Sequence, residues 1–165
     1  MKLKAIDLFI PSDEAKAGIM MALNALKASG RAKAISGLDI QDVQFADGEI
    51  IIDGEFRKGI SLGGKAKLAL CVGEGGNSLG IELRDLTLSN KLLNSMTTFA
   101  IKWLGGIALK DNFYAYMKGM TIWLRLDPLR ELLRGKSFGG FTIEVDSKIS
   151  AVEVSASGIS LSLAA

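Results

Sequence analysis

The sequence of 165 residues contains no histidine, and this absence excludes several kinds of active site. Histidine is the commonest general base, the commonest metal ligand and the usual switch near neutral pH. Without it, neither a Ser-His nor a Cys-His nucleophile pair can form. The sequence also carries no other recognised nucleophile motif. We therefore expect a protein that is not an enzyme and that has no catalytic residues.

Cysteine is almost as scarce, because Cys71 is the only one. A single thiol cannot form an internal disulfide or a thiolate metal cluster, so we expect no metal site and no cofactor. The apolar part of residues 1–15 is short and is interrupted by Lys4 and Asp7, unlike a signal-peptide core. If the chain is complete, we expect a cytoplasmic protein. If a signal segment has been removed, we expect a periplasmic or secreted one.

An excess of charge of one sign is also missing. The net charge of +2 is too small to indicate a nucleic-acid partner, which needs a clustered basic face. Acidic residues are scattered along alternating segments, which places them on a solvated sheet face. Hydrophobic residues make up 48% and charged residues 23% of the chain, as in ordinary globular domains. The length fits one domain over residues 1–165.

The hydrophobic pattern predicts a strand over residues 3–10, a helix from Ser12 to just before Gly30, and a long antiparallel meander. Within the meander, Asp47-Gly48 predicts a hairpin and GEGGNS at residues 73–78 predicts a turn. The alternation loses phase at Arg84-Asp85, which predicts a β-bulge there. Asp53-Gly54 is a candidate bulge or bend. SLGGKAK at 61–67 is interpreted as a turn followed by a strand.

The second half of the chain predicts a helix from residue 92, a strand over 120–126, a short helix from Asp127 to Gly135, and two or three final strands. The last strand alternates with serines and is expected to be solvated on one side. The predicted fold class is therefore α+β, with a long, highly curved antiparallel sheet wrapped around one or two long apolar helices.

The stretch LLNSMTTFAIKWLGGIAL, residues 92–109, is apolar and carries Lys102 as its only formal charge. A membrane-spanning helix needs roughly 20 mostly apolar residues, so this length and its polar groups disfavour spanning. Two interpretations stay open. The stretch is either a buried core helix, or it lines a cavity for an apolar ligand, since ligand sites are usually concave and apolar.

The order of elements resembles the tubular lipid-binding (TULIP) superfamily, and especially its small bacterial phospholipid-binding domains of the bactericidal/permeability-increasing protein type. The segments that carry this resemblance are IDLFIPSDEAKAGIMMALNALKASG, IQDVQFADGEIIIDGEF, KAKLALCVGEGGNSLGIELRDLTL and ISAVEVSASGISLSL. The match is one of pattern, because the family has no short invariant motif. The resemblance implies a twisted sheet around a long helix and a groove for lipid tails.

The preferred hypothesis is non-catalytic binding, or transfer, of a lipid or other long apolar molecule. The candidate lipid-binding residues lie at helical spacing in the two predicted helices: Ile19, Leu23, Leu26, Leu92, Met96, Phe99 and Trp103. Arg130 and Arg134, four residues apart, are candidate contacts for a lipid head group or a membrane surface. A homodimer is also expected, because an open apolar groove tends to pair with itself. The alternative is a structural or assembly module with a packed core and no ligand.

Overall fold

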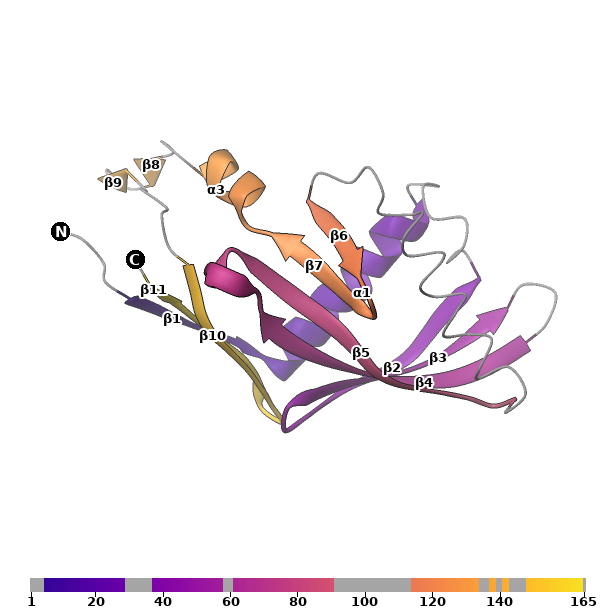
Figure 1. Ribbon diagram of the computed structural model, residues 1–165. Coiled ribbons are helices and arrows are strands. Elements are labelled where there is room, and N and C mark those ends of the chain that lie inside the picture. Colours follow the sequence, from indigo (N-terminus) through magenta and orange to yellow (C-terminus); the bar gives the residue numbers. More distant parts are fainter. Residues whose placement is uncertain are drawn as a thin grey trace.

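A computed structural model describes residues 5–28, 37–57, 61–90, 114–133, 137–138, 141–142 and 148–164 of the chain. Most of these residues are in β-strands (Figure 1). The strands form a three-stranded sheet in the order β1-β11-β10, a six-stranded sheet in the order β2-β3-β4-β5-β7-β6, and a two-stranded pair β8-β9. All described strand pairs are antiparallel.

The smaller sheet joins the first described strand to the last two. It consists of β1 (Ala5–Pro11), β10 (Lys148–Ser155) and β11 (Gly158–Ala164). On one face Leu8 pairs with Leu161, and on the other face Phe9 pairs with Ser160. Ser162 donates a hydrogen bond to Asp7 on this second face, with 2.7 Å between the oxygens. Because alternate residues of a strand point to opposite faces, Ser160 and Ser162 share one face of β11 and Leu161 lies on the other. The predicted serine-faced strand is therefore confirmed.

Helix α1 (Ser12–Ala28) directly follows β1. Asp13 and Glu14 occupy its first turn, where negative charge interacts favourably with the helix dipole. Ala15 is buried, and Ile19 and Met20 pack against the core, whereas Met21 is 71% exposed. The helix therefore buries one face and leaves the other to solvent, as an amphipathic surface helix does.

The larger sheet is a meander extended by a second hairpin. Its strands are β2 (Leu38–Ala46), β3 (Glu49–Arg57), β4 (Ser61–Val72), β5 (Ser78–Leu88), β6 (Ala115–Lys118) and β7 (Thr121–Arg125). The predicted hairpin at Asp47-Gly48 is confirmed: Gly48 has a φ of 78°, a conformation that glycine adopts without strain. The predicted turn at 73–78 is also confirmed and contains a short 3₁₀ helix, Glu74–Gly76.

Two β-bulges keep apolar residues on one face along the whole meander. In β5 the register shifts at the point where Lys67 pairs with Asp85 and Leu68 pairs with Leu83, which confirms the bulge predicted at Arg84-Asp85. In β2 the register shifts between Ile40 and Asp42. Without these extra residues, each strand would turn its apolar side chains to the opposite face beyond the shift.

The core lies between the two sheets and α1. Val43, Ile50 and Val154 are buried there, with 4%, 4% and 5% of their surfaces exposed. The backbone of β10 joins the hairpin of the larger sheet, since Gly48 N donates to Val154 O at 2.8 Å. At the other end of β10, Ile149 is buried beside the turn that contains Gly76.

The predicted fold class is wrong. Strands dominate the described residues, and among them no sheet wraps a long apolar helix. Helix α1 packs with one face only, and the other described α-helix, α3 (Asp127–Leu133), is a single short helix after β7. The expected helix over residues 92–109 lies outside the described residues. The error arose because apolar spacing in α1 indicates one buried face, which does not require a sheet to surround the helix.

Two local predictions also need correction, and one strand was not predicted. Gly54 lies inside a continuous β3, and the bulge is in the partner strand β2. Gly63 and Gly64 lie inside β4, where a turn was predicted. Residues 115–118 form strand β6, which the sequence pattern did not predict. The short helix predicted to begin at Asp127 is confirmed. Strands β8 (Ser137–Phe138) and β9 (Phe141–Thr142) form a minimal pair.

Neither α1 nor any other helix within the described residues combines the length and the hydropathy that are needed to cross a membrane.

Candidate functional site

An apolar groove of about 290 Å³ lies on one face of the larger sheet. Strands β2, β3, β4 and β5 each contribute alternate residues to it, as expected when one face of a sheet is lined by every second side chain. The lining is composed of aliphatic residues, one phenylalanine and two glycines: Leu38, Ile40, Ile52, Gly54, Phe56, Leu62, Gly64, Ala66, Leu86 and Leu88. Among the described residues, no charged or polar side chain belongs to this lining.

The groove and the core occupy the two halves of one continuous face. Ile40 and Ile52 belong to both, because they line the groove and also pack against the buried cluster of Val43, Ile50 and Val154. Towards the hairpin at Asp47-Gly48, β10 and α1 cover the face. Towards the opposite end of the strands, the same pattern of apolar side chains lines the groove.

The hollow is produced by two glycines that face each other across neighbouring strands. Gly54 of β3 pairs with Gly64 of β4, so neither strand places a side chain at this point of the face. A Cβ atom added to Gly64 would lie 2.8 Å from Cδ2 of Leu88, a groove residue. A Cβ atom added to Gly54 would lie 2.9 Å from the backbone oxygen of Asp39. Larger residues at these positions would therefore reduce the groove or displace its walls.

The other face of the same strands is polar. Lys65 lies 3.6 Å from Asp53, and Lys67 lies 3.8 Å from Glu49, as ion pairs between β4 and β3. These side chains are partly exposed, so each pair is expected to stabilise the fold by no more than about 1 kcal/mol. The predicted placement of the scattered carboxylates on a solvated sheet face is confirmed for these residues.

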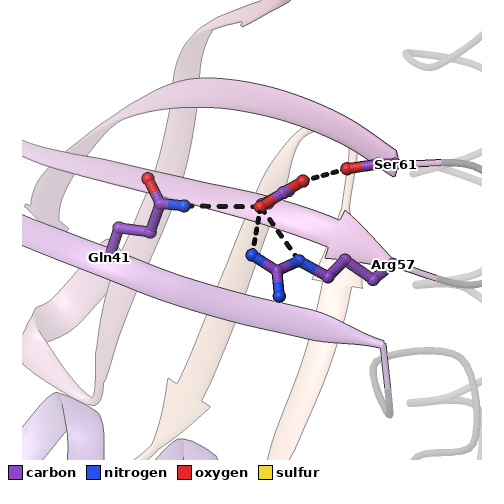
Figure 2. Close-up of polar contacts among 4 residues, drawn as sticks. Gln41, Arg57 and Ser61 are labelled. Carbon is purple, nitrogen blue, oxygen red and sulfur yellow. Dashed lines mark hydrogen bonds and ion pairs between the residues drawn. The ribbon is translucent and has the colours of Figure 1, made fainter.

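Glu55 is the centre of a denser polar network on this second face. Figure 2 shows Gln41, Arg57 and Ser61 converging on one carboxylate, which belongs to Glu55. Arg57 donates through Nε at 3.0 Å and through Nη2 at 2.6 Å, both to Oε2. Gln41 donates to the same oxygen at 3.5 Å, and the hydroxyl of Ser61 donates to Oε1. The Glu55 carboxylate raises the pKa of Arg57 through these hydrogen bonds and its negative charge.

Most of the candidate lipid-binding residues cannot be assigned to this groove. Ile19 lies in α1 and packs against the core cluster instead. Leu23 and Leu26 also lie in α1, but their side chains lie outside what the structure describes. The remaining candidates of this set, Leu92, Met96, Phe99 and Trp103, fall outside the described residues. The groove residues themselves were not selected from the sequence as candidates.

Arg130, a candidate head-group contact, lies in α3 and is bound by partners within the protein. Its NH1 donates to Oδ1 of Asn77 at 3.0 Å and to Oδ1 of Asp127 at 2.7 Å, and only 12% of its side chain is exposed. These contacts tie α3 to the turn between β4 and β5. The other candidate, Arg134, lies outside the described residues, and a role of either arginine in head-group binding stays a prediction.

Metal-ligating and nucleophilic side chains also occur in the part of the chain that the structure describes. No group of three or more Cys, Asp or Glu residues among them could hold a metal ion. Burial, with the nearby charge of Glu82, raises the pKa of the Cys71 thiol, which favours its unreactive protonated form. The described lining of the groove can remove the apolar surface of a ligand from water.

No family model, curated protein or solved structure matches this chain. The resemblance to the TULIP superfamily thus stays a prediction from the sequence pattern.

Proposed function

We propose that this protein binds a lipid or another long apolar molecule without catalysing a reaction on it. The observation that carries the proposal is the groove, whose described lining residues are all apolar or glycine. The ligand would be held by the removal of its hydrocarbon from water, at about 0.8 kcal/mol for each methylene group buried. The TULIP resemblance, as a prediction, implies the same class of ligand.

The glycines of β4 provide a direct test with a matched control. Gly64→Val places a branched side chain in the groove, where its Cβ would meet Leu88. Gly63→Val is the control, because Gly63 precedes it in the same strand and, within the described part of the chain, its Cβ would meet only Ser89 Oγ, at 4.0 Å. Valine is favoured in strands, so neither change opposes the secondary structure.

The measurement is fluorescence titration with N-phenyl-1-naphthylamine, an uncharged aromatic probe that brightens in apolar surroundings. We expect the unsubstituted protein and Gly63→Val to bind the probe alike. Gly64→Val is expected to bind it at least about tenfold more weakly, a loss of roughly 1.4 kcal/mol of binding free energy. Equal binding by the two variants, with both folded, would remove the groove as the binding site.

A second candidate function is assembly with another copy of the chain, and one observation favours it. Strand β1 is at the edge of the smaller sheet as described, and its consecutive residues Leu8, Phe9 and Ile10 are 45%, 54% and 41% exposed. An edge strand with exposed apolar side chains on both faces is suited to pairing with another strand.

Light scattering over a range of protein concentrations tests this assembly. We expect a dimer in the unsubstituted protein and a monomer after Phe9→Lys, because a charged side chain blocks edge pairing. A monomer at every concentration before substitution would exclude assembly through β1 and leave ligand binding as the remaining candidate.

A further inference from the structure

The end of the larger sheet that carries the groove has a polar network on its other face. Glu55 accepts hydrogen bonds from Gln41 of β2, Arg57 of β3 and Ser61 of β4, so one carboxylate joins three adjacent strands (Figure 2). The Glu55 side chain is 21% exposed, while that of Arg57 is 62% exposed. Glu55, the shared acceptor, is thus more enclosed than Arg57, the residue with which it forms an ion pair.

Each member of this network is the immediate neighbour of a residue that lines the groove. Gln41 follows Ile40, Arg57 follows Phe56, and Ser61 precedes Leu62. Glu55 itself stands between Gly54 and Phe56. Glu55, Arg57 and Ser61 lie in regular strand, where successive residues point to opposite faces, so a bond that fixes the polar side chain also fixes the backbone that carries the apolar one. Gln41 is the extra residue of the β2 bulge, next to Ile40.

The two halves of the sheet are therefore stabilised in different ways. The half near the hairpin is held by packing of its apolar face against β10 and α1. In the other half, the polar side-chain contacts between strands include those of Glu55 and the ion pair of Asp53 with Lys65. The Asp53–Lys65 pair joins only two strands at 3.6 Å, and isolated exposed pairs contribute little.

We propose that Glu55 is a positioning residue for the groove: its carboxylate holds the ends of β2, β3 and β4 in register so that Phe56 and Leu62 keep the groove open before a ligand enters. This inference rests on the proposed function and adds a residue on the opposite face of the sheet to it. A groove that is already ordered binds more tightly, because ordering its side chains on binding costs free energy.

Glu55→Gln tests the role, because it keeps the size of the side chain, removes the negative charge that pairs with Arg57, and leaves one acceptor oxygen where the carboxylate has two. Asp53→Asn is the matched control. It makes the same change of charge on the same strand and face, but removes only the pair with Lys65. Both variants are titrated with N-phenyl-1-naphthylamine far below their unfolding temperatures, so that the affinity reports on folded protein. Hydrogen exchange of backbone amides in 38–41, 54–57 and 61–64 is followed in parallel.

We expect Glu55→Gln to bind the probe roughly threefold to tenfold more weakly than Asp53→Asn, the order expected when groove side chains must be ordered on binding. Its amides in the three segments should also exchange faster than those of the control. Unchanged affinity in Glu55→Gln, together with weak binding by Gly64→Val, would overturn the positioning role and leave the groove as the binding site. If the unsubstituted protein takes up no probe, the proposed function fails, and the positioning role fails with it.

Discussion

The Nζ atom of Lys16 in α1 lies 2.6 Å from Oδ1 of Asp42, at the β-bulge of β2. The same carboxylate accepts hydrogen bonds from the backbone N–H of Val43 and from the side chain of Gln44, both at 2.8 Å. These donors, Lys16 above all, lower the pKa of Asp42 from 3.8 to about 2. Two features far apart in the sequence, a helix and a bulge, are thus joined by one carboxylate.

This lowered pKa predicts a window of acid sensitivity. Because the folded protein holds Asp42 ionised more strongly than the unfolded chain does, the stabilisation is fully present above pH 3.8 and is lost as the pH falls towards about 2. Urea unfolding midpoints of the unsubstituted protein and Asp42→Asn, measured through this range, test the assignment. The difference between the two should shrink on acidification, and a difference that stays constant would contradict the pKa shift.

The shared apolar face predicts that substitutions in its two halves differ in their effect on stability. Ile50→Ala removes a side chain that is 4% exposed in the core and should lower the free energy of unfolding by about 2–5 kcal/mol. Leu62→Ala, in the groove, should lower it by less in ligand-free protein, because a side chain beside a groove makes fewer contacts. Met21→Ala is the control, because it also removes apolar atoms, but from a side chain that is 71% exposed and not packed in the core or the groove.

The comparison is made by chemical denaturation after organic extraction of any bound lipid. Equal losses for Ile50→Ala and Leu62→Ala would indicate that the groove is packed as tightly as the core. That result would favour the assembly module over ligand binding.

The raised pKa of Cys71 predicts slow alkylation. Only the thiolate reacts, and burial in β4 beside Glu82 reduces its fraction at any given pH. Iodoacetamide should therefore modify Cys71 more slowly in the folded protein than in urea. The reference is Ser157→Cys in a Cys71→Ala background, since residue 157 is exposed and should react at the rate of a free thiol. Equal rates at the two positions would contradict the burial effect.

Native mass spectrometry with organic extraction is the most direct test of a bound ligand. If the groove is occupied in purified protein, we expect a discrete added mass that extracts as fatty acid or phospholipid and is reduced in Gly64→Val. A bare protein mass that also stays bare after incubation with phosphatidylcholine vesicles would oppose lipid binding. Gly63→Val serves again as the control, because its side chain faces away from the groove.

Features set by local chemistry could be predicted from the sequence. The hairpin at Asp47-Gly48, the start of the short helix at Asp127 and the bulge at Arg84-Asp85 were all predicted because turn residues, caps and phase shifts act over a few residues. Gly54 and Gly64 were misinterpreted as turn or bend signals. A glycine can also lie inside a strand, where it marks a hollow or a close approach of another segment. The sequence pattern does not distinguish this case from a turn, whereas the register of β3 with β4 does.

The sequence by itself determined the absence of histidine chemistry, the alternation that gives the meander one apolar and one polar face, and the local turns. Tertiary structure decided which part of that apolar face is core and which part is groove, because β10 and α1 cover the end near Val43 and Ile50. It also decided that Gly54 faces Gly64 and that Glu55 joins three strands. These relationships depend on which strands become neighbours and in which register, and alternation within one strand contains no information on its partner.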